Sequence, residues 1–222
     1  RERERERMMS KRFSKGSKIS YLYKPVRKDV RSKVLLFFAH ATGMHKELFL
    51  PNVERIRKRF DFDFAALDFR GHGDSPKLKL DEDGFMRESW DRIFVEDIYE
   101  VLRELPKYEM ILGIGHSMGA ANLVHAQLSR RCFDGLVLCE PILPFPGGTG
   151  LMRDSSSRRH PFAERTVRRR NSWKNVDEAM KYFLSKPMFA RWHKDCVKVH
   201  VQEGLKRTDD NEFKLKCEPV QE

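Results

Sequence analysis

Uninterrupted apolar runs alternate with amphipathic segments along the first 140 residues of the chain. The runs are short and rich in branched and aromatic residues, which is typical of strands buried in a sheet. They predict strands at residues 19–23, 34–39, 62–69, 110–114 and 135–140. Apolar residues that recur every three or four positions predict helices at residues 47–60, 90–105 and 118–130. This alternation is typical of an α/β fold with a doubly wound, mostly parallel sheet, and the weak first strand, ended by Pro25, is expected at its edge.

The pattern changes after residue 142, where proline and glycine residues predict a loop and amphipathic segments follow without strand patterning. Ser172 is expected to cap a helix that reaches Leu184, and a second helix is expected at residues 187–205. We expect four parts: a disordered basic tail at 1–17, a core at 18–143, a helical part at 144–211 and the start of a return to the core at 212–222.

The 222-residue chain has a net charge of +11, which two segments supply almost entirely. Residues 1–18 carry +5 and residues 153–170 carry another +5. No zinc-finger or RRM pattern accompanies this charge, so we interpret both segments as solvated and expect no nucleic-acid partner. The longest apolar run, residues 34–39, is far shorter than a membrane span, and no secretory signal pattern is present.

The cysteines are widely spaced and give neither a disulfide framework nor a zinc site. They are Cys132, Cys139, Cys196 and Cys217. Free thiols are typical of a reducing compartment, so a cytoplasmic location is predicted. No histidine pair has the spacing of metal ligands, and neither a metal nor another cofactor is expected.

The segment with the clearest chemistry is Gly115-His116-Ser117-Met118-Gly119, between a predicted strand and a predicted helix. A G-x-S-x-G turn in that setting is a nucleophile elbow, in which a strained serine projects its hydroxyl from the sheet edge. Both glycines are expected to be essential because side chains there would collide with the neighbouring strand and helix. The Met118 N–H, at the helix N-terminus, is placed to receive the anion that forms when Ser117 attacks a carbonyl. A chance match is the alternative, and the flanking strand and helix argue against it.

Two further stretches follow the strands upstream of the elbow: residues 40–43 (HATG) and residues 68–75 (DFRGHGDS). Together with the elbow they resemble, in the same order, three motifs of the α/β-hydrolase family, and the resemblance covers residues 18–143. It implies that Thr42 N–H joins Met118 N–H in an oxyanion hole, and that the helical part at 144–211 is a cap that follows the sixth strand. It also implies structural roles for the side chains of His40, Asp68, Arg70 and His72. A pair of ordinary surface helices is the alternative to this cap.

A serine nucleophile on this fold needs a base and an acid, which normally follow it in the order Ser, Asp/Glu, His. Their usual positions come after two further strands, so the C-terminal part of the fold is expected to be incomplete. Within the chain, the candidate acid is Glu140 and the candidate bases are His160, His193 and His200. Each has a structural alternative: Glu140 can hydrogen-bond to the cap loop, and the histidines can lie exposed on the cap. The strand at 135–140 is expected to expose an unpaired edge through which two chains associate.

Two functions are consistent with these residues. The first is a serine hydrolase that forms an acyl-enzyme on Ser117 from a small carboxylic ester, thioester or similar acyl substrate. The second is a truncated or degenerate relative without catalysis that binds a ligand or a partner. A fragment of a longer gene product is favoured over degeneration because the elbow is intact. Labelling of Ser117 by a fluorophosphonate separates the two functions.

Overall fold

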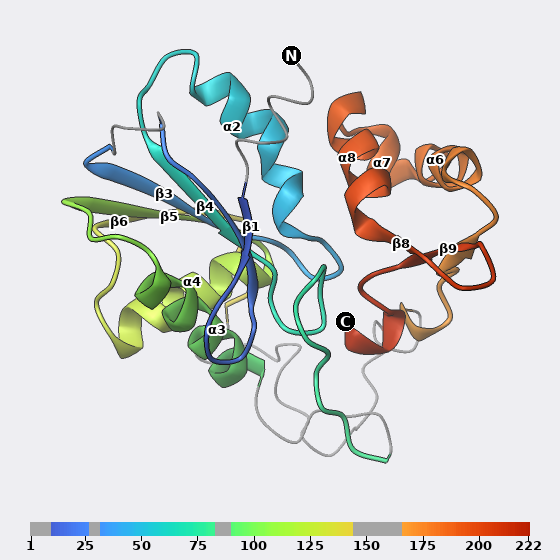
Figure 1. The fold of residues 1–222 in the computed structure, drawn as a ribbon, viewed down its shortest axis with the longest axis horizontal. Helices are drawn as coiled ribbons and strands as arrows, with labels where there is room; N and C mark the ends of the chain where they lie inside the picture. The colour runs from blue at the N-terminus through green and yellow to red at the C-terminus, as the bar shows by residue number, and fades with distance from the viewer. Residues whose placement is uncertain (1–9, 27–31, 83–89, 144–165) are drawn as a thin grey trace.

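The computed structural model describes residues 10–26, 32–82, 90–143 and 166–222, and a six-stranded sheet lies at its centre (Figure 1). The strand order is β1-β2-β4-β3-β5-β6. The strands are β1 (Ser10–Phe13), β2 (Ser20–Lys24), β3 (Val34–Ala39), β4 (Asp63–Leu67), β5 (Met110–His116) and β6 (Gly135–Cys139). The last four run parallel to one another, whereas β1 and β2 are antiparallel to their neighbours. The mostly parallel sheet confirms the predicted fold class.

Helices cover both faces of this sheet (Figure 1). On one face lie the 3-10 helix η1 (Lys46–Phe49) and α2 (Leu50–Ile56), and on the other lie α3 (Trp90–Glu104) and α4 (Met118–Ser129). Strand β3 therefore buries both of its faces: Leu35 and Phe37 pack with α3 and α4, while Phe38 packs with Val53 of α2. This double burial explains why the strand has no polar alternation in sequence.

Residues 10–17 are ordered, which corrects the prediction of a disordered tail for this part of the chain, and residues 1–9 lie outside the described residues. Strand β1 pairs with β2, so β2 is an inner strand and not the predicted edge. Ser14 is completely buried and its hydroxyl donates to Glu100 of α3, whose carboxylate also accepts from Ser17 N–H. Composition alone suggests disorder because it does not reveal these partners on a distant helix.

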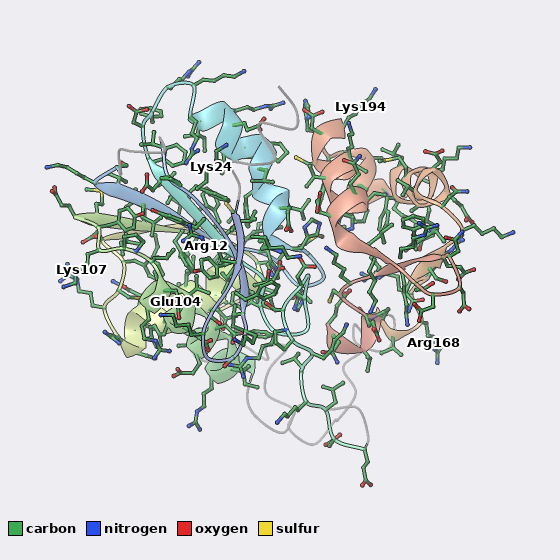
Figure 2. All side chains as sticks on the ribbon, viewed as in Figure 1. Arg12, Lys24, Glu104, Lys107, Arg168 and Lys194 are labelled. Carbon is green, nitrogen blue, oxygen red and sulfur yellow. The ribbon has the colours of Figure 1, made fainter. Side chains whose placement is uncertain are left out.

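Exposed charges are spread over several sides of the molecule. Figure 2 shows Lys107, Arg168 and Lys194 at the periphery, pointing away from the sheet and from one another. Of the two basic segments in the sequence, residues 1–9 and 153–165 lie outside the described residues. Among described helices, none is long and apolar enough to cross a membrane.

A second unit, which we call the cap, lies beside the sheet and comprises the described residues 166–215 (Figure 1). Its elements are β7 (Ser172–Trp173), α6 (Val176–Leu184), α7 (Pro187–Ala190), α8 (Lys194–Gly204), β8 (Leu205–Arg207) and β9 (Phe213–Leu215). The strands form a small antiparallel sheet in the order β7-β9-β8, which the sequence does not predict. Trp173 of β7 and Val201 of α8 belong to a separate hydrophobic core inside the cap.

Three details of the cap differ from the prediction. Asn175, and not Ser172, caps α6, because its side chain accepts from Glu178 N–H while Ser172 lies in β7. The predicted helix at 187–205 is divided into α7 and α8. Residues 213–215 join the cap sheet and do not start a return to the core. That return follows them, where η2 (Pro219–Gln221) packs on the loop after β4 and Gln221 Oε1 accepts from Leu78 N–H at 2.6 Å.

Candidate active site

Ser117 lies between the end of β5 and the start of α4, at the turn that the sequence predicts. Its backbone has φ 51° and ψ −116°, and a positive φ is uncommon for a residue with a side chain. Its N–H donates to Cys139 O on β6 at 2.9 Å, and its carbonyl accepts from Ala121 N–H at 3.0 Å. These hydrogen bonds hold the strained residue in place from both sides.

Gly115 and Gly119 have no room for a side chain. A Cβ on Gly119 would lie 2.3 Å from Ala39 O on β3 and 2.5 Å from His40 O. A Cβ on Gly115 would lie 2.5 Å from Ala120 Cα. All three neighbours are backbone atoms, which cannot move aside as the end of a flexible side chain can. The absence of two side chains therefore lets β3, β5 and α4 meet closely at the turn.

The start of α4 leaves the hydroxyl of Ser117 available. A serine at a helix N-cap commonly accepts a hydrogen bond from an amide of the first turn, but the Ser117 side chain makes no such bond. The N–H of Met118 belongs to that first turn, where amides lack an acceptor within the helix and carry partial positive charge. A hydroxyl and a hydrogen-bond donor are thus adjacent, as attack on a carbonyl requires.

The loop of residues 40–47 follows β3 and contains the second predicted donor, Thr42. A turn in this loop is closed by a hydrogen bond from Met44 N–H to Ala41 O at 3.1 Å. Gly43 has the positive φ, +73°, that the third position of a type II turn requires. The Thr42 N–H takes no part in the closing bond, so the turn itself does not use this donor.

His40 fastens the 40–47 loop to the end of β4. Its Nε2 accepts from Phe69 N–H at 3.1 Å, so its Nδ1 carries the proton and donates to Ala41 O at 2.8 Å. Burial lowers the pKa of His40 to about 3, and burial also lowers the pKa of His72 to about 3. Both rings are therefore neutral near pH 7 and engaged in structural contacts.

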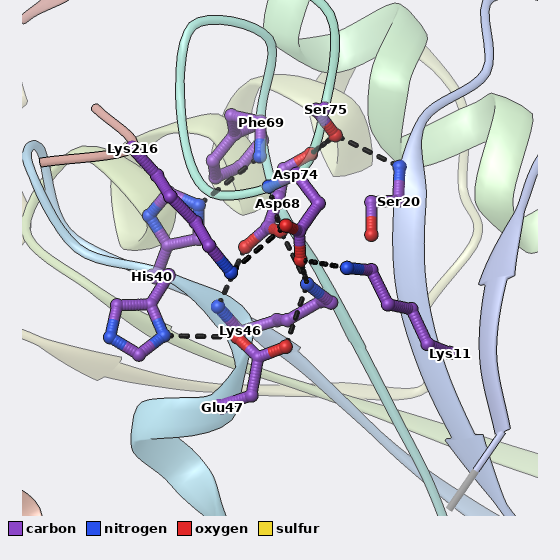
Figure 3. Close-up of polar contacts among 11 residues, drawn as sticks. Lys11, Ser20, His40, Lys46, Glu47, Asp68, Phe69, Asp74, Ser75 and Lys216 are labelled. Carbon is purple, nitrogen blue, oxygen red and sulfur yellow. Dashed lines mark hydrogen bonds and ion pairs between the residues drawn. The ribbon is translucent and has the colours of Figure 1, made fainter. Parts of the chain in front are cut away.

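Lys46 of η1 is completely buried and is surrounded by carboxylates (Figure 3). Its Nζ lies 2.6 Å from Asp68 Oδ2, 2.7 Å from Glu47 Oε1 and 2.8 Å from Asp74 Oδ2. Its backbone N–H donates to Asp68 Oδ1 at 2.8 Å. Asp68 thereby joins the 40–47 loop to the loop that follows β4.

Two more lysines complete this charge cluster (Figure 3). Lys11 Nζ lies 2.6 Å from Asp74 Oδ2, and Lys216 Nζ lies 2.9 Å from Asp74 Oδ1. Although burial disfavours the charged form, the surrounding carboxylates raise the pKa of Lys46, which stays protonated. The charge cluster is Lys11, Lys46, Glu47, Asp68, Asp74 and Lys216. It ties the 40–47 loop to the N-terminal strand and to the segment that follows the cap.

Sequence reasoning missed most of this cluster. The motif at 68–75 includes both aspartates, but only Asp68 receives a role from it. Lys11, Lys46 and Lys216 lie in three segments that share no spacing or motif, so no sequence signal connects them. Their association depends on the fold that brings those segments together.

Glu140, the candidate acid, lies just after β6 with a side chain that is 88% exposed. Its Oε2 is 3.6 Å from Nε2 of His116, the residue before Ser117. Among the described residues, no hydrogen bond or ion pair joins Glu140 to His193 or His200. The structure therefore does not bring the candidate acid into contact with these two candidate bases.

The candidate bases have different surroundings. His193 is exposed before α8, where its Nε2 lies 2.9 Å from Arg55 Nη2. His200 is buried inside the cap, and burial lowers its pKa to about 3. His160 lies outside the described residues. Within the described ranges, no hydrogen bond joins the Ser117 hydroxyl to a histidine.

The remaining reactive side chains do not form a second centre in the part of the chain that the structure describes. All four cysteines are free thiols. No group of three or more His, Cys, Asp or Glu residues there is arranged to hold a metal ion.

The chain is similar to known proteins in its sequence profile and in its fold. The sequence profile of the alpha/beta hydrolase family matches residues 36–211. A search of curated proteins gave no match. Among solved structures, peroxisomal alpha-beta-hydrolase Lpx1 from Saccharomyces cerevisiae is similar, with a TM-score of 0.69 and 19% identity over 91% of this chain. The match covers 58% of the yeast protein, so this chain spans less than two thirds of its length.

Two other solved structures have the same fold. The thioesterase domain from the curacin biosynthetic pathway has a TM-score of 0.69 and 17% identity, over 96% of this chain and 70% of that domain. The esterase Rv0045c from Mycobacterium tuberculosis has a TM-score of 0.67 and 16% identity, over 97% of this chain and 67% of that protein. At such identities the likeness establishes the fold alone.

Proposed function

Because the chain belongs to the alpha/beta hydrolase family, we propose that it is a serine hydrolase acting on a carboxylic ester, thioester or similar acyl substrate. The observation that carries this proposal is the backbone of Ser117, which is held at a positive φ with its hydroxyl free of capping bonds. Strain of this kind persists only where surrounding structure enforces it, and it is common at active sites. A serine kept only for structure at a helix N-cap would be expected to use its hydroxyl for capping.

In the proposed reaction, the Ser117 oxygen attacks the substrate carbonyl and its proton passes to a base. The carbonyl oxygen becomes an anion, which the N–H groups of Met118 and Thr42 stabilise. Collapse of this intermediate breaks the bond to the alcohol or thiol, which leaves with a proton, and Ser117 remains acylated. Attack by water then releases the acid and restores the serine.

The base and the acid remain predictions from the sequence. Glu140 is proposed as the acid and His160, His193 or His200 as the base, because these residues follow Ser117 in the order that the family uses. The contacts of His193 with Arg55 and the burial of His200 make both less suitable for this role as the structure stands. An acid and base supplied by a longer gene product are the alternative source.

Replacement of the nucleophile tests the function. In the full-length gene product, Ser117→Ala should abolish hydrolysis of p-nitrophenyl butyrate, because it removes the attacking oxygen. Its circular dichroism spectrum and melting temperature should match those of the unchanged protein, since one partly exposed hydroxyl is lost. A variant that keeps most of the esterase rate would show that Ser117 is not the nucleophile.

A non-catalytic ligand-binding protein is the second candidate. It is favoured by one observation, the absence of a histidine hydrogen-bonded to Ser117 within the described residues. A folded protein with the natural C-terminus that binds acyl ligands, yet neither hydrolyses esters nor reacts with a fluorophosphonate, would support this function over the first.

Two further predictions stay proposals. Among the described residues, β6 lies at the edge of the sheet and exposes Val137 and Leu138, and we propose that a second copy of the chain pairs with it. Val137→Lys should then shift size-exclusion elution toward the monomer. We also propose a cytoplasmic location, because the four cysteines form no disulfide with one another and free thiols are typical of a reducing compartment.

A further inference from the structure

Glu222 lies against the 40–47 loop, beside the residue that follows Thr42. Its side chain is only 7% exposed, and a Cβ placed on Gly43 would lie 2.9 Å from the Glu222 Cδ and 3.0 Å from its Oε2. Gly43 has the positive φ of the turn at residues 41–44, so the carboxylate covers the corner of that turn. The covered residue is therefore the next one in sequence after a proposed oxyanion donor.

The segment that carries Glu222 is held by the loop after β4. Gln221 Oε1 accepts from Leu78 N–H at 2.6 Å, and a Cβ on Gly71 would lie 3.1 Å from the same oxygen. In Figure 1, η2 lies beside that loop and below the cap. The residue before Glu222 is thus fixed on the loop after β4, while the Glu222 side chain reaches Gly43 on the other loop.

The partner of this carboxylate comes from the cap. Arg169, which precedes β7, pairs with Glu222 through its Nη2, and no other ion pair reaches Glu222 within the described residues. Burial raises the pKa of Glu222, and the neighbouring Arg169 opposes that rise. Arg169 and Gly43 also line the same cavity of about 270 Å³. A residue of the cap therefore neutralises a carboxylate that lies on the 40–47 loop.

The charge of Glu222 matters because an oxyanion hole has to receive a negative charge. A second negative charge nearby repels the oxyanion, and the repulsion is strong where water is excluded. If the cation of a buried pair is removed, the carboxylate is left uncompensated. It then either stays and repels the anion, or moves into water and gives up its contact with Gly43.

Other contacts hold the 40–47 loop independently of Arg169. His200 of α8 stacks on His45 at 5.6 Å, with an angle of 16° between the rings. Lys46 joins the loop to the charge cluster through Asp68. Loss of the Arg169 side chain should therefore loosen the turn at residues 41–44 without detaching the loop from the core.

We propose that Arg169 is a positioning residue for the oxyanion hole: it holds the Glu222 carboxylate against Gly43 and cancels its charge, so that the turn at residues 41–44 stays in place and accepts an anion. The inference rests on the proposed function, in which Thr42 N–H is one of the donors, and adds a residue of the cap to that site. Arg169 acts through Glu222 and need not touch the substrate. Direct binding of the substrate is the competing explanation, because Arg169 lines the cavity.

Hydrolysis of p-nitrophenyl butyrate by variants of the full-length gene product tests this role. Arg169→Met should lower kcat at least about tenfold with little change in KM, a smaller loss than the roughly 10²–10³-fold cost of removing an oxyanion donor. Adding Glu222→Gln removes the uncompensated charge and should bring kcat back to within about threefold of the unchanged protein. Arg169→Lys keeps the charge and should also stay within about threefold, because a single guanidinium nitrogen contacts Glu222.

Arg168→Met is the matched control, because Arg168 is exposed at the periphery, and its kcat should stay unchanged (Figure 2). Arg169→Gln is a second neutral variant, used if Arg169→Met does not fold. A double variant no faster than Arg169→Met would overturn the proposal, since a merely structural contact is not repaired by removing its other half. A loss confined to KM would also overturn it and assign Arg169 to substrate binding.

Hydrogen exchange separates this inference from the proposed function. Met44 N–H closes the turn by its bond to Ala41 O, so its exchange rate measures how often the turn opens. In the 222-residue chain, Arg169→Met should speed this exchange at least about fivefold, and the added Glu222→Gln should return it to within about twofold.

The outcomes for Arg169 and for the hydrolase are distinct. The expected exchange rates, together with no ester hydrolysis by the full-length gene product, would support the role of Arg169 in holding the turn and contradict the hydrolase. Ester hydrolysis with Met44 exchange and kcat unchanged in Arg169→Met would support the hydrolase and overturn the role of Arg169.

Discussion

The elbow at residues 115–119 and the loop at residues 40–47 carry the two proposed oxyanion donors, yet different forces hold them in place. At the elbow, position is enforced by close contact: Gly119 approaches the carbonyl of Ala39 so closely that a Cβ would be 2.3 Å from its oxygen. In the loop, position is enforced by buried charge, with Lys46 bound by Asp68 and its neighbours. The elbow has no space for side chains at its glycines, whereas the 40–47 loop depends on charged side chains.

The elbow and the 40–47 loop should therefore tolerate substitutions differently. A close backbone contact has no adjustable part, so an added carbon atom has to displace a strand or a helix. A buried ion pair is stable only while both partners and their hydrogen bonds remain, so loss of one partner leaves an uncompensated charge. The elbow should therefore fail by steric clash, and the loop by loss of one charge.

The largest effect is expected at the elbow. Gly119→Val should leave no soluble folded protein, since the added atoms overlap backbone of β3 and cost more than about 4 kcal/mol. The matched control is Gly135→Ala on β6, where a Cβ would lie 3.1 Å from the movable end of the Leu112 side chain. Expression yield and circular dichroism provide the measurement, and a folded Gly119→Val protein would refute the steric explanation.

The next effect is expected in the charge cluster. Lys46→Met should lower the free energy of unfolding by about 3–5 kcal/mol, because it leaves buried carboxylates without their central cation. Lys33→Met is the control: this lysine pairs with Glu109 at the surface, where both side chains are more than two thirds exposed, so the loss should be below about 1 kcal/mol. Urea denaturation measures both, and equal losses would show that burial does not strengthen the Lys46 contacts.

Acid should destabilise the 40–47 loop and the loop after β4 through one neutral histidine in each, His40 and His72. Burial lowers the pKa of both His40 and His72 to about 3, so between pH 6.5 and 3 the unfolded chain binds protons that the folded chain does not. Their contribution to stability is complete above pH 6.5 and is lost as pH falls toward 3, by at most about 1.4 kcal/mol per pH unit for each histidine. His72→Phe should flatten this dependence in urea denaturation series, and an unchanged slope would contradict it.

The smallest effect is expected where the N-terminal segment meets α3. Glu100→Gln should lower the free energy of unfolding by about 1–2 kcal/mol, because Ser14 and Ser17 lose a charged acceptor. Hydrogen exchange should increase in residues 10–13, which carry Lys11 of the charge cluster. Exchange that stays unchanged would mean that other contacts hold this segment.

The elbow could be predicted from sequence because its causes are local. Ser117, its two glycines and the apolar residues before and after them lie within 20 residues, and periodicity identifies the strand and the helix. The fold class followed from the same patterns. Ser14 shows where this reasoning fails: its acceptor on Glu100 is 86 residues away, so composition suggested a tail where the structure has a strand.

The charge cluster that holds the 40–47 loop and the strands of the cap could not be predicted from sequence for the same reason, because their partners are distant in sequence. Lys216 meets Asp74 only after the cap has folded back, and β9 pairs with β7 and β8 across most of the cap. Strands of two or three residues are too short to produce an alternating pattern. The roles of His193 and His200 were also undetermined, because their contacts come from elements separated in sequence.

Covalent labelling tests the central claim, that the elbow presents Ser117 as a nucleophile beside an oxyanion hole. The 222-residue chain and its Ser117→Ala variant are incubated with a fluorophosphonate, and the labelled peptide is identified by mass spectrometry. We predict slow labelling at one site, Ser117, because the oxyanion hole and binding together retain a rate of roughly 10³–10⁴ over water when a triad is removed. Absence of labelling in the folded chain, or equal labelling of the Ser117→Ala variant, would contradict the claim.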